Sequence, residues 1–191
     1  MIQYSDKMAL KAIFIVVHLI GVFIGVWGAI ITDVSFMRSL KKKFLGAEDL
    51  KDITEGSSVV WVGILVILLS GIALFSFDPA GYLAYPKFLA KMTVVAILLL
   101  NGIVFHFKHL TELRGAVNKE FPSENFAKKS ASLFVSGAVS TTSWIAAIIL
   151  GFLPALPLSY STIMLIYFSL LALAAVAALF MRKMLWIKRL S

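Results

Sequence analysis

Three histidines offer the widest range of chemistry in this sequence: His18, His106 and His109. A neutral imidazole can ligate haem iron or a divalent metal ion, and it can also transfer a proton near neutral pH. His106 and His109 are three residues apart, so on a helix they share one face and could chelate a cation. We therefore predict these three as cofactor-binding residues, with haem b or a divalent metal ion as the cofactor. The structural alternative is a neutral histidine held by a hydroxyl or a carbonyl group.

Two acidic residues border apolar stretches of the chain: Asp33 follows the first stretch and Glu55 precedes the second. If both stretches cross the membrane, the two carboxylates reach the same level as His106 and His109. Carboxylates beside imidazoles suit zinc, iron or manganese. These four residues are the predicted metal ligands. The alternative is ordinary ion pairing with nearby cations, namely Arg38, Lys51 and Lys108.

Uncharged polar side chains lie within the apolar stretches and predict an intramembrane polar path: Ser70, Asn101, Ser140 and Ser143. Polar groups that face the interior of a helical bundle can line the route of a small cation or a proton. The alternative is structural. Serine hydroxyls often bond back to a carbonyl of their own helix, and a buried asparagine often joins two helices.

The elements that position these residues follow from the composition. Of the 191 residues, 60% are apolar and 15% are charged, whereas a soluble domain has about 45–50% apolar and about 25% charged residues. The chain is therefore predicted to be an integral membrane protein. It has no cysteine, so thiolate metal sites, c-type haem attachment and dithiol redox chemistry are excluded.

The charged residues divide the chain into stretches long enough to cross a bilayer, which takes about 20 mostly apolar residues. The predicted fold is all-α, a single domain over residues 1–191. Its five transmembrane helices are predicted at 12–32, 57–77, 86–107, 130–153 and 160–181. The last two share one uncharged run between Lys129 and Arg182, which is too long for one span. A turn at Pro154 and Pro157 is predicted to divide it.

Lysine and arginine are distributed unevenly among the predicted connections. Fourteen of the 18 lie after the first span, after the third span or in the C-terminal tail. The positive-inside rule places these segments in the cytoplasm, so the N-terminus is predicted outside and the C-terminus inside. The expected location is a bacterial plasma membrane. The net charge of +8 is thus a topology signal, and no nucleic-acid partner is expected. The lipid bilayer is the expected partner, with a second copy or another membrane protein as further candidates.

The first predicted span carries glycines four residues apart, Gly21 and Gly25, a spacing that favours close packing of two membrane helices. His18 shares their face, so we expect it to point towards a neighbouring helix. The helix is expected to continue to a C-cap at Gly46. With a rise of about 1.5 Å per residue, His18 lies roughly 9 Å and His106 roughly 27 Å below the outer surface. This difference in depth disfavours one haem bridged by both.

The segment Val17-His18-Leu19-Ile20-Gly21, followed by Gly25, Trp27 and Gly28, resembles the first helix of two types of small bacterial membrane protein. These are the copper-resistance D type and the membrane-bound, haem-dependent protoporphyrinogen oxidase type. The resemblance implies b-type haem and makes His18 a candidate haem ligand.

The expected function is accordingly that of a redox or haem- or metal-associated membrane protein. The alternatives are a small cation or proton transporter or channel, and a non-catalytic membrane subunit or scaffold. The sequence contains no nucleophile elbow, phosphate-binding loop or zinc-protease motif. Whether the protein is an enzyme therefore stays open.

Overall fold

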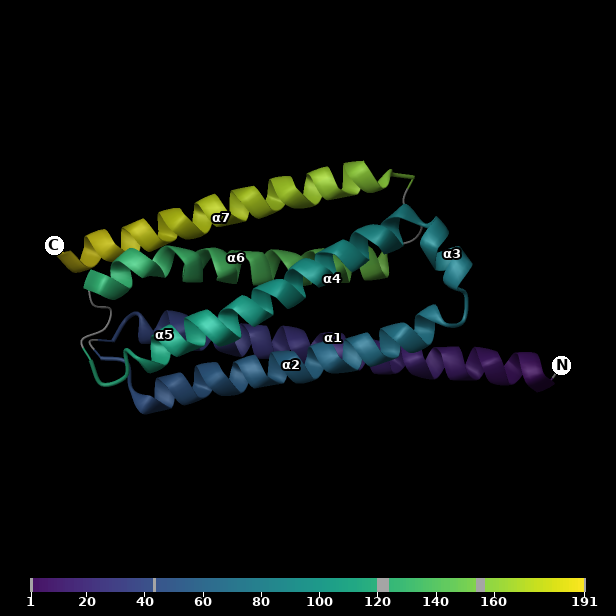
Figure 1. The fold of residues 1–191 in the computed structure, drawn as a ribbon, viewed down its shortest axis with the longest axis horizontal. Coiled ribbons are helices and arrows are strands. Elements are labelled where there is room, and N and C mark those ends of the chain that lie inside the picture. The colour runs from purple at the N-terminus through teal and green to yellow at the C-terminus, as the bar shows by residue number, and fades with distance from the viewer. Residues whose placement is uncertain (1, 43, 120–123, 154–156, 191) are drawn as a thin grey trace.

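The computed structural model describes residues 2–42, 44–119, 124–153 and 157–190. In these ranges the chain is helical, and an isolated bridge is the only extended pairing (Figure 1). The elements in chain order are α1 (Ile2–Ser39), α2 (Ala47–Phe75), α3 (Pro79–Ala84), α4 (Pro86–Val104), the π-helical turn η1 (Phe105–His109), α5 (Leu110–Arg114), α6 (Glu124–Phe152) and α7 (Tyr160–Leu190).

Five helices of the described chain are long and apolar enough to cross a membrane, which confirms the predicted all-α fold with five such helices. They lie within Ser5–Ser39, Ala47–Phe75, Pro86–Arg114, Ser130–Phe152 and Tyr160–Leu185. Large apolar side chains are exposed along all five, as a lipid-facing surface requires. The chain is therefore a multi-pass membrane protein. Its two ends lie at opposite ends of the bundle (Figure 1).

The second apolar helix is shorter at its C-terminus than the predicted span 57–77, because α2 ends at Phe75. The short helix α3 follows almost at once. Asp78 caps α3 by accepting a hydrogen bond from the Gly81 backbone N–H at 3.0 Å, and Pro79 occupies the first helical position. Both are favoured start signals for a helix.

The last two long helices extend beyond the predicted spans. α6 runs from Glu124 to Phe152, and its apolar part, Ser130–Phe152, agrees with the predicted span 130–153 to within one residue. α7 continues to Leu190, past the predicted end at 181. The predicted turn falls partly on residues 154–156, which lie outside the described residues. After it, the Ser159 hydroxyl accepts a hydrogen bond from the Thr162 backbone N–H at 3.2 Å at the start of α7.

The expectation of a C-cap at Gly46 is wrong, because α1 ends at Ser39 and Gly46 precedes α2 as its N-cap. The Gly46 backbone N–H donates to the Asp49 carboxylate at 3.1 Å, and Lys42 pairs with the same carboxylate. A carboxylate in the first turn is favourable near a helix N-terminus. The acidic residue three positions after Gly46 therefore marks a helix start.

Glycines bring the backbones of α1 and α2 into direct contact along an antiparallel pair. A Cβ atom placed on Gly63 would lie 2.5 Å from Gly25 Cα and 2.9 Å from the Gly21 carbonyl oxygen. A Cβ on Gly28 would lie 2.8 Å from the Gly56 carbonyl oxygen. The glycine face of the first helix thus packs on a neighbouring helix, as its spacing predicted.

The remaining long helices pack against this pair through α6, which contacts both α1 and α7. Trp144 of α6 lies against α1, where a Cβ atom on Gly25 would come within 2.8 Å of the indole Cζ2. α4, α6 and α7 share an apolar core of Ala90, Val94, Leu150, Ile163, Met164 and Tyr167.

The connection that leads into α2 contacts the connection that follows α5, at one end of the bundle. Leu45, before α2, and Val117, after α5, form the isolated parallel bridge. The Asn118 backbone N–H donates to the Leu45 carbonyl oxygen at 3.0 Å. A second core of Phe36, Leu40, Leu45, Ile53, Leu110, Leu113, Phe126, Leu133, Phe134 and Ala178 fills this end.

Candidate functional site

Two cavities in the bundle contain ionisable side chains from membrane-spanning helices. The first, which we call the Asp33 cavity, has a volume of about 440 Å³ and lies between α1, α2, α4, α6 and α7. The second, the His18 cavity, has a volume of about 370 Å³ and lies between α1, α2, α4 and α6. Leu98 of α4 lines both.

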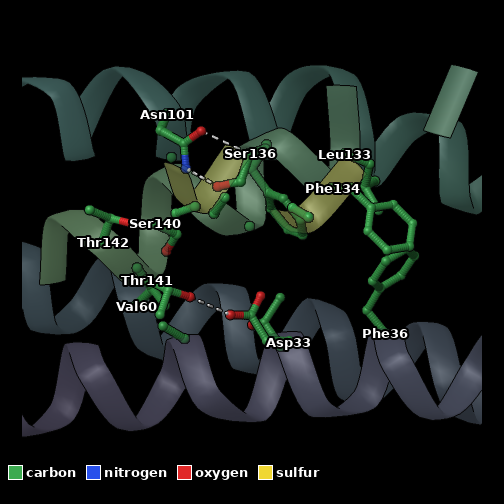
Figure 2. A pocket seen from close by; sticks show the side chains of 18 of the residues that line it. Asp33, Phe36, Val60, Asn101, Leu133, Phe134, Ser136, Ser140, Thr141 and Thr142 are labelled. Carbon is green, nitrogen blue, oxygen red and sulfur yellow. Dashed lines mark hydrogen bonds between the residues drawn. The ribbon is translucent and has the colours of Figure 1, made fainter. Parts of the chain in front are cut away.

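Asp33 projects from α1 towards α6 in the first cavity (Figure 2). The Thr141 hydroxyl donates to its Oδ2 at 3.3 Å, and its Oδ1 lies 3.8 Å from the position that a Cβ on Gly137 would occupy. Among the described residues, no Lys, Arg or His nitrogen lies within 4 Å of the carboxylate. Asp33 is therefore an unpaired carboxylate in a membrane-spanning helix.

The rest of the Asp33 cavity combines hydroxyl groups with aromatic rings. Ser57, Ser140 and Thr142 supply hydroxyls to its lining. Four aromatic side chains also line it: Phe36, Trp61, Phe105 and Phe134. The described lining contains no second acidic residue and no basic residue. The cavity thus offers one carboxylate, several hydroxyl oxygens and aromatic rings, a combination that suits a cation.

Asn101 and Ser136 form a reciprocal pair at the wall of the same cavity (Figure 2). Asn101 Nδ2 donates to the Ser136 carbonyl oxygen at 3.0 Å, and the Ser136 hydroxyl donates to Asn101 Oδ1 at 2.9 Å. The pair joins α4 to α6. Since both side chains are engaged with each other, they fix the shape of the cavity.

His18 lies against α2 in the second cavity, as its place on the glycine face predicted. Its Nδ1 is 3.0 Å from the Ser70 hydroxyl oxygen. Ser70 itself donates to the Val66 carbonyl oxygen at 2.5 Å. A hydroxyl has one proton, so when Ser70 donates to Val66 the imidazole donates from Nδ1. In the neutral ring the lone pair then remains on Nε2.

Lys91 and Trp144 are the other polar residues of the His18 cavity. Lys91 reaches from α4 towards the C-terminal end of α6, where its Nζ lies 3.8 Å from the position of a Cβ on Gly151. Trp144 is 4% exposed, and its indole N–H has no hydrogen-bond partner among the described residues. The remaining lining residues are apolar or glycine, and none in this part of the chain is acidic.

An apolar cluster separates the polar groups of the two cavities. Ala29, Ile64, Leu98 and Trp144 form it, and all four are buried. Because Leu98 and Trp144 each line at least one of the cavities, the cluster is the wall between them.

The predicted metal ligands do not gather around one point in the described chain. No group of three or more His, Asp or Glu side chains lies close enough to hold a metal ion there. Glu55 is exposed and pairs with Lys51 at 3.7 Å, which is the ion-pair alternative. His109 is buried, with Nδ1 3.4 Å from Glu112 Oε2. Its neighbour His106 has a buried Nδ1 without a hydrogen-bond partner among the described residues.

The π-helical turn explains why His106 and His109 do not share one face. His106 and His109 both belong to η1, whose wider turn does not align residues three apart. His106 contacts the ring of Phe107, and His109 contacts that of Phe105. The two imidazoles therefore have different surroundings.

The four residues of the predicted polar path belong to three separate places. Ser70 holds His18, while Asn101 and Ser140 line the Asp33 cavity. Ser143 donates to the Val139 carbonyl oxygen at 2.6 Å and contacts the Tyr167 hydroxyl at 2.9 Å, in the interface of α6 with α7.

The histidines do not fit a haem held by two imidazoles. His109 contacts Phe105, which packs on the core that contains Phe36. Phe36 follows His18 on α1 by a length of roughly 27 Å at about 1.5 Å per residue. Neither His106 nor His109 lines the cavity of His18. Axial ligands of one iron must lie on the two sides of a single porphyrin, so His18 has no histidine partner in its cavity.

Four functional candidates were missed by sequence reasoning: Lys91, Gly137, Thr141 and Trp144. Lys91 had a visible signal, since it is a charged residue inside a predicted span. Gly137 and Thr141 become significant only because α6 faces Asp33. Trp144 had the appearance of an interfacial aromatic residue, and its unpartnered N–H emerges only from the packing.

Comparison of the chain with protein families, with curated proteins and with solved structures finds no match.

Proposed function

We propose that this protein binds a small organic cation in the Asp33 cavity and carries it across the membrane. The observation that carries the proposal is the unpaired Asp33 carboxylate in a cavity of about 440 Å³ inside the bundle. An ionisable residue within a membrane-spanning segment is costly to keep and is by default a functional candidate.

The charge of the ligand follows from the energetics of the carboxylate. Burying an ionised group away from water costs several kcal/mol unless another charge compensates it. Among the described residues, Asp33 has one neutral hydrogen-bond partner, the Thr141 hydroxyl at 3.3 Å. A bound cation would supply the missing charge, and two unit charges 4 Å apart attract by about 4 kcal/mol at an effective dielectric constant of about 20.

The aromatic lining favours an organic cation over a divalent metal ion. Calcium requires six to eight oxygen ligands and magnesium a near-ideal octahedron, whereas Asp33 is the sole acidic residue of the described lining. Phe36, Trp61, Phe105 and Phe134 line the cavity, and aromatic rings can attract weakly hydrated ammonium groups. The volume of about 440 Å³ also lies within the range of small-molecule pockets, about 300–1,000 Å³.

Access to the cavity supports movement of a ligand through the bundle. Thr141, Ala177 and Met181 line the cavity and are exposed, so it is open at the side of α6 and α7. Towards the His18 cavity, the buried cluster around Leu98 closes it. Transport would require these apolar side chains to separate, as in gated membrane carriers.

We further propose that the N-terminus faces the outside and the C-terminus the cytoplasm. The distribution of Lys and Arg supports this orientation, since 14 of the 18 lie in connections on one predicted side or in the C-terminal tail. The organic cation would then reach Asp33 near the cytoplasmic end of α1.

Flux measurements in liposomes test the proposed function. The probe is benzyltrimethylammonium, because its charge is permanent and its ring suits an aromatic lining. We expect saturable uptake by the wild type and at least a tenfold loss in Asp33→Asn, while Asp33→Glu retains part of the flux. Asp52→Asn is the matched control, because Asp52 is an exposed carboxylate of α2 that lines neither cavity.

Unchanged flux in Asp33→Asn, or an equal loss in Asp52→Asn, would contradict the proposal. Folding of each variant is checked by its thermal transition in detergent.

A further inference from the structure

We propose that the His18 cavity is a second binding site, for an amphipathic anion whose carboxylate or phosphate head is held by Lys91. This inference does not depend on the function proposed for Asp33. It rests on other residues in another cavity, and its ligand has the opposite charge.

Lys91 supplies the positive charge of the site. It lines the cavity, and the described lining contains no Asp or Glu. No carboxylate of the described residues lies within 4 Å of its ammonium group. A lysine within a membrane-spanning helix that has no acidic partner is expected to attract an anion.

The walls of the cavity suit an apolar chain. Ile15 and Leu19 of α1, Leu68 of α2 and Phe152 of α6 line it, and all four are also exposed on the membrane-facing surface. The cavity is therefore open sideways to lipid. An amphipathic molecule dissolved in the bilayer can therefore enter the cavity together with its apolar chain, without passing through water.

The depth of Lys91 matches an anionic head at the membrane boundary. Lys91 stands in the second turn of α4, which begins at Pro86. The neighbouring Lys87 donates to the Leu153 carbonyl oxygen at the end of α6. An acyl chain that extends from Lys91 towards Leu98 would thus run from the boundary into the hydrocarbon region.

Binding of carbonyl-¹³C-labelled decanoate tests the proposal by NMR, with the full-length protein in phosphatidylcholine nanodiscs and protein-free nanodiscs as background. We expect a saturable, protein-dependent signal. Lys91→Met should weaken binding at least tenfold. Lys91→Arg should retain most of the affinity.

Lys87→Met is the matched control, because Lys87 lies one turn away on α4 and does not line the cavity. It should leave decanoate binding unchanged. Equal losses in Lys87→Met and Lys91→Met would show a general surface charge effect and overturn the proposal. So would a decanoate signal no larger than that of protein-free nanodiscs, or wild-type affinity in Lys91→Met.

The source of the anion is tested by repeating the titration in nanodiscs that contain phosphatidylglycerol. If decanoate affinity falls in proportion to the phosphatidylglycerol content, the lipid headgroup occupies the same site. If it does not change, the site selects the free carboxylate. Either result supports an anion site at Lys91, provided that Lys91→Met abolishes it. Loss of this site with intact benzyltrimethylammonium flux would leave the Asp33 proposal standing.

Discussion

Replacing Gly63 by alanine should separate α1 from α2. The added Cβ atom would lie 2.5 Å from Gly25 Cα and 2.9 Å from the Gly21 carbonyl oxygen. Both atoms belong to the backbone, so no side-chain rotation relieves the contact. Ordinary van der Waals contact between carbon atoms begins at about 3.5 Å, and the helices must therefore move apart by about 1 Å.

The expected change in the free energy of unfolding combines two destabilising effects with one stabilising effect. Overpacking of a tight interface costs about 1–3 kcal/mol, and a gap of about 0.5–1 Å elsewhere along the helix pair removes a quarter to a half of the dispersion energy there. Alanine returns about 0.5–1 kcal/mol because it is a better helix former than glycine. We expect a net loss of about 1–2 kcal/mol, or a fall of about 2–8 °C in Tm for a chain of this size.

Gly71→Ala is the matched substitution on the same helix. Its Cβ atom would meet nothing closer than His18 Cε1, at 3.6 Å, so the helix-propensity gain should leave Tm unchanged or slightly raised. Thermal unfolding of both variants in one detergent measures the difference. Equal Tm values for Gly63→Ala and the wild type, or an equal fall in both variants, would show that the close contact at Gly63 does not limit stability.

Three further predictions concern the helix contacts, the orientation and the ligand. In a double-mutant cycle, Asn101→Leu and Ser136→Ala should couple by about 0.6 kcal/mol, typical of one hydrogen bond between membrane helices, because the bond from Asn101 to the Ser136 backbone carbonyl survives in Ser136→Ala. Additive losses in unfolding free energy would contradict this. The chain has no cysteine, so a membrane-impermeant maleimide should label Ala80→Cys in intact cells and Lys41→Cys only after lysis, and the reverse pattern would invert the orientation. Acidification should weaken benzyltrimethylammonium binding, because a proton and the cation compete for the Asp33 carboxylate; an affinity that does not change with pH would exclude this competition.

The arrangement of α1 against α2 could be predicted because its signals are local. Gly21 and Gly25 repeat at helical spacing, and this spacing indicates a close helix contact whatever the partner. His18 lies on the same face by the same periodicity. The identity of its partner could not be predicted, because Ser70 is one of many serines and only the register of the two helices selects it.

The surroundings of Asp33 could not be predicted, because they depend on residues far away in the sequence. Sequence reasoning placed this residue at the end of a span beside Glu55, His106 and His109. In the structure it faces Thr141 and Gly137, which lie more than a hundred residues later in the chain. Which helix α1 meets after α2 depends on how all five pack, and no local pattern encodes that choice.

Backbone irregularities account for the other differences. The predicted shared face of His106 and His109 assumes a regular α-helix, but both lie in the π turn η1. Gly46 is compatible with either helix terminus, and it is the Asp49 carboxylate that makes it an N-cap. The sequence alone therefore marks Gly46 as a helix terminus but does not decide between an N-cap and a C-cap.

The most direct test of the account is the affinity of benzyltrimethylammonium for the purified protein in nanodiscs, measured by isothermal titration calorimetry for the wild type, Asp33→Asn and Asp52→Asn. If Asp33 binds the cation, the wild type has one saturable site and Asp52→Asn binds with unchanged affinity. Asp33→Asn then binds at least tenfold more weakly, which corresponds to about 1.4 kcal/mol. Equal affinities in all three proteins, or no saturable binding to the wild type, would contradict it.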